Sequence, residues 1–214
     1  MSRNVALALI VACLFASMVA NPANAETRGI LGIGIGAVSA VGTPVGDENG
    51  PSQLFTFRGE ALFGPSDWFL LAADVSIGLP HTYDGLVAGG GAQEVEVQMV
   101  FFDGLVGVYK VFSDGGFIYL GGGLTVASAD VTDTRTDPGD IDIFETDFGA
   151  SLGFVYGLGL GLPISEDIFG FVSARQRFVT GEGEIRGPGF RADQDVSLGG
   201  FDMAVGVGFG FGLD

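Results

Sequence analysis

The sequence of 214 residues is poor in basic residues, cysteine and histidine. It has 9 lysines and arginines against 26 aspartates and glutamates, which gives a formal net charge of −17. Binding to nucleic-acid phosphates needs a basic face, so this composition excludes nucleic acid as a partner. Cysteine occurs once, at Cys13, and a single cysteine cannot form an internal disulfide framework. The stability of the fold therefore has to come from another source.

Long apolar runs are also missing once the first 25 residues are passed. Before that point, Arg3 is followed by the apolar stretch Val5–Ala20 and then by Ala23-Asn24-Ala25. This is the order of a basic start, an apolar segment and the small-x-small pattern that signal peptidase cleaves. We expect residues 1–25 to be a cleaved signal peptide and residues 26–214 to form one mature domain.

Two alternatives to cleavage exist for this leader. The apolar stretch could stay as a membrane anchor, although it is short and runs into Asn21-Pro22. Ile10-Val11-Ala12-Cys13 loosely matches a lipoprotein box, although apolar residues continue beyond Cys13. Cleavage after Ala25 would leave a mature protein without a thiol.

What the sequence does contain is strict alternation, which is clearest between Asp195 and Leu213. Large apolar residues occupy every second position, and glycine, alanine or aspartate lies between them. The large residues are Phe201, Met203, Val205, Val207, Phe209, Phe211 and Leu213. A strand with this pattern turns a continuous apolar face toward lipid, and about 9–11 such residues span a bilayer. The stretch therefore predicts a transmembrane β-strand.

The same alternation recurs along the chain and predicts eight strands. We expect them at about 28–40, 55–63, 69–77, 95–111, 118–126, 147–160, 171–178 and 195–213. Short turns at 64–67, 113–116 and 163–167 should alternate with long loops at 42–52, 80–93, 129–143 and 181–194. Asp103 falls on the apolar phase, which predicts a bulge at Asp103-Gly104. Glycine strings such as Gly32–Gly36 indicate a narrow lumen with room only for small side chains.

The chain resembles the small eight-stranded outer-membrane barrels that include the transmembrane domain of outer-membrane protein A and the opacity-type proteins. The matching segments are the glycine and aromatic-rich terminal strand from Gly199-Gly200-Phe201 to Phe211, Phe117–Gly123, and Phe171–Arg175. The resemblance covers residues 28–213. It implies an all-β, eight-stranded antiparallel up-and-down transmembrane β-barrel. The chain departs from the family by ending on Leu213-Asp214, because such barrels usually end on an aromatic residue that the insertion machinery reads.

The resemblance also implies a location and partners. The location is the outer membrane of a Gram-negative bacterium. The partners are outer-membrane lipid and lipopolysaccharide, the outer-membrane assembly machinery and an extracellular surface partner, and we expect a monomer. No cofactor and no metal are implied.

The most informative polar residues lie on the small-residue phase of the predicted strands. They are Arg58, Asp74, Arg175, Arg177 and Asp202. An uncompensated charge inside a barrel is costly, so we expect Arg58 to pair with Asp74, and Arg175 or Arg177 to pair with Asp202. This lumen ion-pair network could be a plug that fills the interior or a gate that opens a small pore. The narrowness of an eight-stranded interior favours the plug.

The segment from residue 129 to 143 is strongly acidic, and Asp137, Asp140 and Asp142 are candidate cation contacts because Ca²⁺ and Mg²⁺ prefer oxygen ligands. The calcium-loop pattern fails, since Ile141 and Ile143 separate the carboxylates. A solvated acidic loop is the simpler interpretation.

Catalytic patterns are weak. Gly149-Ala150-Ser151-Leu152-Gly153 fits the serine-hydrolase pattern, but it lies within an alternating strand rather than in a strand-turn-helix. Some barrels of this architecture modify lipid A, and His81 with Ser76 or Asp84 is the sole candidate for such a site. We therefore expect a non-enzymatic barrel, with its lumen closed by ion pairs, that contributes to envelope integrity or surface adhesion. A narrow gated pore, a lipid A-modifying enzyme and a soluble exported β-protein are the alternatives.

Overall fold

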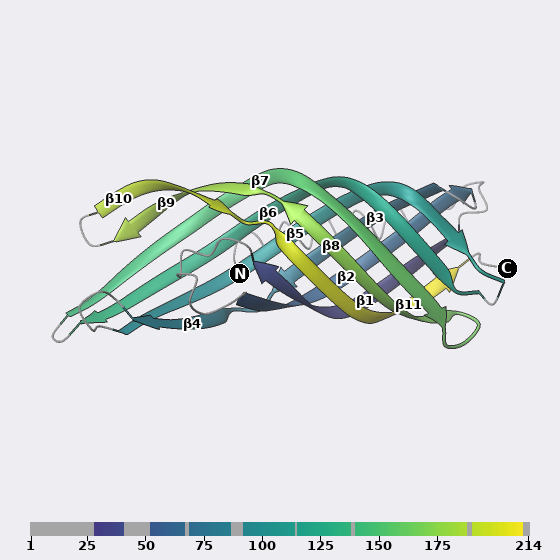
Figure 1. The fold of residues 1–214 in the computed structure, drawn as a ribbon, viewed down its shortest axis with the longest axis horizontal. Coiled ribbons are helices and arrows are strands. Elements are labelled where there is room, and N and C mark those ends of the chain that lie inside the picture. The colour runs from purple at the N-terminus through teal and green to yellow at the C-terminus, as the bar shows by residue number, and fades with distance from the viewer. Residues whose placement is uncertain are drawn as a thin grey trace.

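The computed structural model describes residues 28–40, 52–66, 69–86, 92–113, 115–137, 140–187 and 190–211. The predicted signal peptide lies outside these residues. The described residues form eleven strands of one sheet (Figure 1). The strands are β1 (Arg28–Ala40), β2 (Ser52–Ser66), β3 (Phe69–Gly78), β4 (His81–Leu86), β5 (Ala92–Val111), β6 (Phe117–Asp137), β7 (Asp140–Pro163), β8 (Ile168–Phe178), β9 (Thr180–Gly187), β10 (Phe190–Ser197) and β11 (Gly200–Phe211). Among the described residues, no helix has the length and hydropathy needed to cross a membrane.

Eight of these strands close into a barrel. Their order around the wall is β1, β2, β3, β5, β6, β7, β8 and β11, and β11 pairs again with β1. Every neighbouring pair in this circuit is antiparallel. Closure satisfies the backbone hydrogen-bonding groups that an open edge would expose to lipid. The predicted eight-stranded antiparallel barrel is confirmed.

The other three strands continue the wall beyond one end of the barrel. β4 follows β3 after Leu79-Pro80, and Pro80 has no backbone N–H to donate. β9 follows β8 directly, and β10 directly precedes β11. At the two junctions, the Leu198 amide donates a hydrogen bond to the Val179 carbonyl, 3.0 Å away. β4, β9 and β10 form a sheet together with the ends of three barrel strands, residues 92–99 of β5, 128–137 of β6 and 140–148 of β7. We call this sheet, whose order is β4-β5-β6-β7-β9-β10, the extension (Figure 1).

Three of the predicted loops are wrong, because most of their residues form strands of the extension. The segments 80–93, 129–143 and 181–194 were expected to be long loops, but most of their residues belong to β4, β6, β7, β9 and β10. Aspartate, glycine and proline interrupt the sequence in the way that loops do, yet cross-strand pairing overrides this local preference. Most of the fourth expected loop, residues 42–51, lies outside the described residues.

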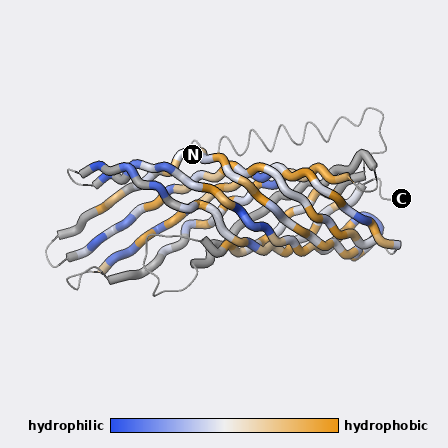
Figure 2. The backbone as a smooth tube through the Cα atoms, turned by 45° about the horizontal axis from the view of Figure 1, so that its top comes forward, coloured by the Kyte–Doolittle hydropathy of each residue, from blue (hydrophilic) through white to orange (hydrophobic). Residues whose placement is uncertain are grey.

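Bulky apolar side chains cover the outside of the barrel. Ile33 on β1 is 71% exposed, Phe154 on β7 is 69% exposed and Val205 on β11 is 60% exposed. Figure 2 shows apolar residues concentrated along the barrel, while hydrophilic residues are more frequent in the extension. An apolar surface of this extent is stable against lipid and unstable against water. We call it the lipid belt.

The polarity of the two faces of the wall reverses between the lipid belt and the extension. In the extension half of β5 the inward residues are Val95, Val97, Met99 and Phe101, all buried, while Glu94 and Glu96 are exposed. A wall in water exposes charge and buries apolar residues, whereas a wall in lipid does the opposite. The same phase continues through the buried Asp103, so the expected bulge at Asp103-Gly104 is wrong.

A register shift lies on β7 instead. Ala127 of β6 pairs with Ser151, but Ala129 pairs with Phe148, so residues 149–150 of β7 lie opposite the single residue Ser128 and β7 has one extra residue. Phe148 therefore points inward, although it lies an even number of residues from the outward-facing Leu152 and Phe154. The bulge changes the phase of β7 where the wall passes from lipid to water.

The inner wall also holds large side chains, which corrects the expectation of a lumen with room only for small ones. Phe117, Tyr119, Phe169 and Phe171 are buried inside the barrel. Glycines face these rings. A Cβ on Gly161 would collide with Phe117, and one on Gly32 would lie 2.5 Å from Phe171. The glycines thus make room for aromatic rings from neighbouring strands.

Candidate functional site

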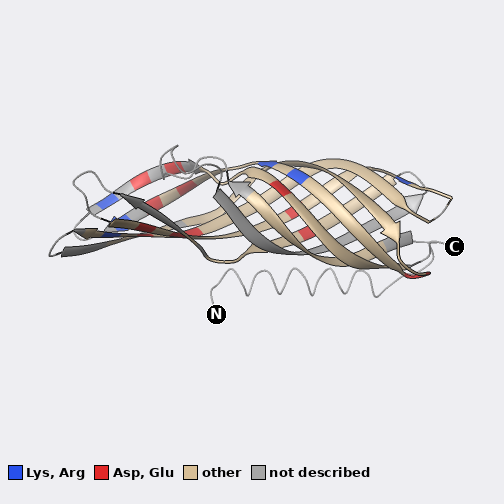
Figure 3. Cartoon of the chain, turned by 60° about the horizontal axis from the view of Figure 1, so that its bottom comes forward, with Lys and Arg blue, Asp and Glu red and all other residues tan. Residues whose placement is uncertain are grey.

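Two apolar layers fill the lumen, and a layer of charge separates them. The turn-side apolar layer comprises Ile30, Leu70, Ala72, Leu105, Phe117, Tyr119, Val155, Phe169 and Phe171. The extension-side apolar layer comprises Val38, Val95, Val97, Met99, Phe101, Ala127, Ala129, Phe148, Val179 and Leu198. The ion-pair layer between them comprises Asp74, Asp103, Arg175, Arg177 and Asp202. Figure 3 shows this small group of charges part-way along the barrel, separate from those of the extension.

The strand pairing explains why these charges meet. Arg175 and Arg177 are two residues apart on β8, so both side chains point inward. Asp202 of β11 pairs directly with Arg175. On the other side of the lumen, Asp74 of β3 pairs directly with Asp103 of β5. Two carboxylates in such a position repel each other unless cations reach them, and here the cations come from β8.

Asp103 is the centre of the layer. Its Oδ2 accepts hydrogen bonds from Arg175 Nη1 at 3.1 Å and from Arg177 Nη2 at 2.6 Å. Arg177 Nε lies 3.0 Å from both carboxylate oxygens. These bonds join β5 to β8, which are not neighbours in the wall. Charge-assisted bonds of this kind are the strong hydrogen bonds of proteins.

The remaining carboxylates complete the layer. Arg177 Nη1 contacts Asp202 Oδ2. Asp74 Oδ2 lies 3.6 Å from Arg175 Nη2, and Ser76 Oγ donates to Asp74 Oδ1 at 2.9 Å. The charged side chains are 0–1% exposed, so each has lost its hydration and depends on its partners.

The ion-pair layer also packs against apolar side chains. The Arg177 guanidinium lies 4.4 Å from the centre of the Phe101 ring, which belongs to the extension-side apolar layer. Along β5, Phe101, Asp103 and Leu105 are spaced two residues apart and belong to three successive layers. The lumen is thus filled by apolar, ionic and again apolar side chains.

The overall fold matches solved outer-membrane barrels. The outer membrane protein OprG of Pseudomonas aeruginosa superposes with a TM-score of 0.61 at 12% identity, covering 88% of this chain and 99% of that chain. The chain has the fold of the small outer-membrane β-barrels. The attachment invasion locus protein Ail of Yersinia pestis gives a TM-score of 0.51 at 12% identity, covering 87% of this chain and 99% of that chain. No protein-family model matches the sequence, and no curated protein does so.

The barrel fold and the lipid belt together establish the setting of the chain. An outward apolar wall around a closed barrel needs hydrocarbon, and the superposed proteins are outer-membrane proteins. The chain is therefore an outer-membrane barrel, in agreement with the location expected from the sequence.

The barrel brings together four of the five residues predicted for the lumen. Asp74, Arg175, Arg177 and Asp202 lie in one layer. The backbone of Arg58 pairs opposite Ser76, but its side chain is outside the described residues, so its expected pair with Asp74 stays a prediction.

Sequence reasoning missed the role of Asp103. It assigned the phase of Val95 and Val97 to lipid, and Asp103 shares that phase. One signal could have found it, because β5 has 20 residues and a bilayer needs only about ten. Half of β5 therefore had to lie outside lipid, where apolar residues turn inward.

The acidic candidates lie at the end of the β6–β7 hairpin. Asp137 and Asp140 pair with each other and Asp142 pairs with Arg135, but the side chains of these aspartates are outside the described residues. Within the described ranges, no three His, Cys, Asp or Glu side chains converge as a metal site.

The catalytic candidates are placed as follows. The backbone of His81 pairs with Val97 in the extension, and its side chain is outside the described residues. Ser76 is buried in the lumen and donates to Asp74. Ser151 donates to the Gly149 carbonyl at 3.2 Å within β7, which lacks the strand-turn-helix of a nucleophile elbow.

Proposed function

We propose that this chain is a non-enzymatic outer-membrane barrel with a closed lumen, and that it presents the extension at the cell surface for interaction with a partner, such as in adhesion. The observation that carries the proposal is the height of the wall. β5, β6 and β7 have 20, 21 and 24 residues, about twice what a bilayer needs. The surplus lies in water and offers a rigid surface.

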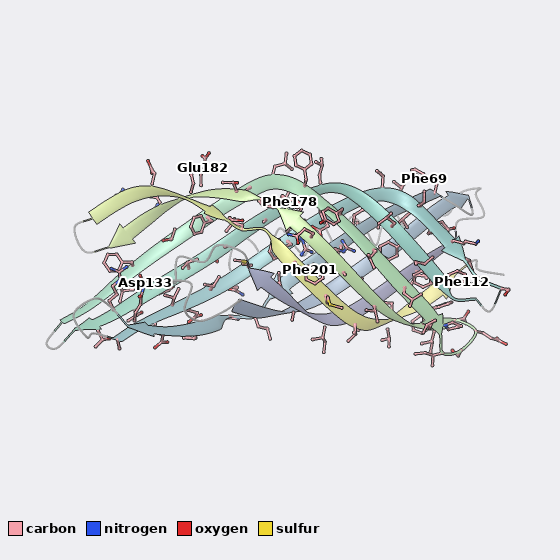
Figure 4. The ribbon with its side chains drawn as sticks, in the orientation of Figure 1. Phe69, Phe112, Asp133, Phe178, Glu182 and Phe201 are labelled. Carbon is pink, nitrogen blue, oxygen red and sulfur yellow. The ribbon has the colours of Figure 1, made fainter. Side chains whose placement is uncertain are left out.

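The outer face of the extension supports this role. Its exposed acidic residues are Glu94, Glu96, Asp130, Glu182, Asp193 and Asp195. Figure 4 shows Glu182 projecting away from the wall. Charged side chains on the outer face belong in water, and the apolar residues behind them hold the sheet in shape. An extension that served only to anchor the barrel would not need to stand clear of the lipid.

The filled lumen supports a closed scaffold rather than a channel. A solute would have to displace the turn-side apolar layer, the ion-pair layer and the extension-side apolar layer in turn. An eight-stranded barrel is barely wide enough for its own side chains. A closed wall of this kind preserves the permeability barrier of the membrane. Lipopolysaccharide around the belt, the assembly machinery and a monomeric state remain part of the proposal.

Adhesion of whole cells tests the proposal. A non-adherent bacterial host would express the chain or a variant in which residues 182–195 are replaced by Asn-Gly, a two-residue hairpin turn. Retention of cells on epithelial monolayers is expected to rise with the full chain and to fall to the host level with the variant. A heat-shift gel would show that the trimmed barrel still assembles. Equal retention of the two strains, or none with either, would exclude the surface role.

A role limited to envelope integrity predicts a different pattern. A strain that lacks the protein would then become sensitive to detergent, and the trimmed variant would restore resistance as fully as the complete chain. Restoration by the complete chain alone would favour a role for the extension.

A further inference from the structure

We propose that Arg135 anchors an oxyanion-binding site on the inner face of the extension, and that its ligand carries a carboxylate or phosphate group. The site is formed by Gln93 of β5, Asp133 and Arg135 of β6, and Phe144 of β7. Ala129 has the same phase as Arg135 on β6 and is buried, so Arg135 also points to the inner face. Figure 4 shows Asp133 toward the open end of the extension.

One edge of the Arg135 guanidinium is already held in place. Nε and Nη2 donate to Asp133 Oδ2 at 3.1 and 2.9 Å. The other oxygen, Asp133 Oδ1, accepts a hydrogen bond from Gln93 Nε2 at 3.0 Å. Both oxygens of the carboxylate are therefore engaged, and the arginine is oriented before any ligand arrives. Orientation in advance reduces the entropy lost on binding.

The second edge of the guanidinium donates to no side chain that the structure describes; Asp142, which pairs with Arg135 across β6 and β7, has its side chain outside the described residues. Nη1 makes no hydrogen bond with any residue that the structure describes, and the Arg135 side chain is 43% exposed while that of Asp133 is 18% exposed. The Phe144 ring supports the guanidinium from one side, 4.8 Å from its centre. The edge formed by Nη1 and Nη2 matches two oxygens of a carboxylate or a phosphate.

The surrounding charge restricts the ligand. The chain has a formal net charge of −17, and its field opposes the approach of any anion. Because Asp133 balances Arg135, geometry rather than net charge has to select the ligand. We infer a small molecule or a terminal group with one oxyanion, such as an acidic or phosphorylated sugar.

Two other arginines of the extension share only part of this arrangement. Arg186 Nε and Nη2 also donate to one oxygen, Glu184 Oε2, at 3.4 and 3.1 Å, but no described aromatic ring supports its guanidinium and no described amide holds Glu184. Arg186 and Arg191 both contact Glu184, at 3.1 and 3.4 Å, and their side chains are 63% and 75% exposed. Exposed pairs of this kind move freely and add little energy. Arg186 therefore provides a matched control for Arg135.

Titration of the purified full-length barrel in detergent micelles tests the site. The ¹⁵N signal of Arg135 Nε would be followed on addition of galacturonate, glucose 6-phosphate or neutral glucose. We expect a saturable shift with at least one of the two anions and none with glucose, and the comparison of the two separates carboxylate from phosphate. Arg135→Lys keeps the charge but loses the planar fork, so affinity measured by ligand-observed NMR should fall about tenfold or more. Arg186→Lys should bind like the unmodified protein.

A second variant protects the test against misfolding. Phe144→Leu should also weaken binding while the heat-shift gel still reports a folded barrel. The proposal is overturned by the absence of a saturable shift with either anion, or by unchanged affinity in Arg135→Lys. The inference deepens the proposed surface role but fails separately from it. If cells adhere but neither anion gives a saturable shift, the oxyanion site alone is excluded. If an anion gives a saturable shift but cells do not adhere, the surface role alone is excluded.

Discussion

Asp103 and Arg177 face each other across the lumen although they are 74 residues apart in the sequence. Arg177 Nε and Nη2 reach the Asp103 carboxylate at 3.0 and 2.6 Å, from a strand that does not border β5 in the wall. The pair therefore ties opposite sides of the barrel together. Pairing between neighbouring strands closes the wall, while this contact sets the distance across it.

Asp103→Asn should destabilise the barrel. The change removes the charge that both Arg175 and Arg177 contact and leaves two buried guanidiniums with less compensation. Breaking a buried pair in this way typically costs about 3–5 kcal/mol. Urea unfolding in detergent micelles would measure the loss. Asp193→Asn on the exposed outer face is the control and should not change the midpoint, so equal midpoints for the two variants would contradict the central role of Asp103.

Gly161→Ala should destabilise the barrel because the new Cβ would collide with the Phe117 ring. Overpacking of this kind costs about 1–3 kcal/mol. Gly149→Ala is the matched control, since a Cβ at Gly149 meets no atom within 4 Å. Phe117→Leu should restore part of the stability lost in Gly161→Ala. Equal loss at both glycines would show that ring packing is not the reason for Gly161.

The barrel should not conduct ions in planar lipid bilayers. One apolar layer lies on each side of the ion-pair layer and would still block the lumen in Arg175→Ala. This variant should therefore also show no conductance. Steady conductance steps that appear in the unmodified protein and change in Arg175→Ala would support the gated pore instead.

Single cysteines should map the border between lipid and water. Glu94→Cys and Glu182→Cys lie on the outer face of the extension and should react with a membrane-impermeant maleimide on intact cells. Val205→Cys and Phe154→Cys lie in the lipid belt and should be protected until the membrane is dissolved. Labelling of Val205→Cys in intact cells would refute the placement of the belt.

Expression of the chain should leave the lipid A mass spectrum unchanged. Ser76 is buried in the lumen with its hydroxyl directed at Asp74, away from the lipid where an acyl chain would lie. His81→Ala should give the same spectrum as the unmodified protein. A modified lipid A that disappears in His81→Ala would establish the enzymatic alternative.

The wall of the barrel could be predicted from the sequence because its information is local. In β11 and β1 the two-residue period is unbroken, so the side chains that face lipid follow from the order of residues alone. For the same reason Arg175 and Arg177 could be assigned to the lumen. The number of strands in the barrel wall then followed from counting alternating segments, and closure followed from the cost of an open edge in lipid.

Tertiary structure decided which face of each strand meets which medium. The alternation of β5 is as regular as that of β11, yet its large residues turn inward because that part of the wall stands in water. A period of two defines two faces without stating which is inside. Asp103 became part of the ion-pair layer only when closure placed β5 across from β8, because the distance between strands that are not neighbours depends on the whole circuit and on no local pattern.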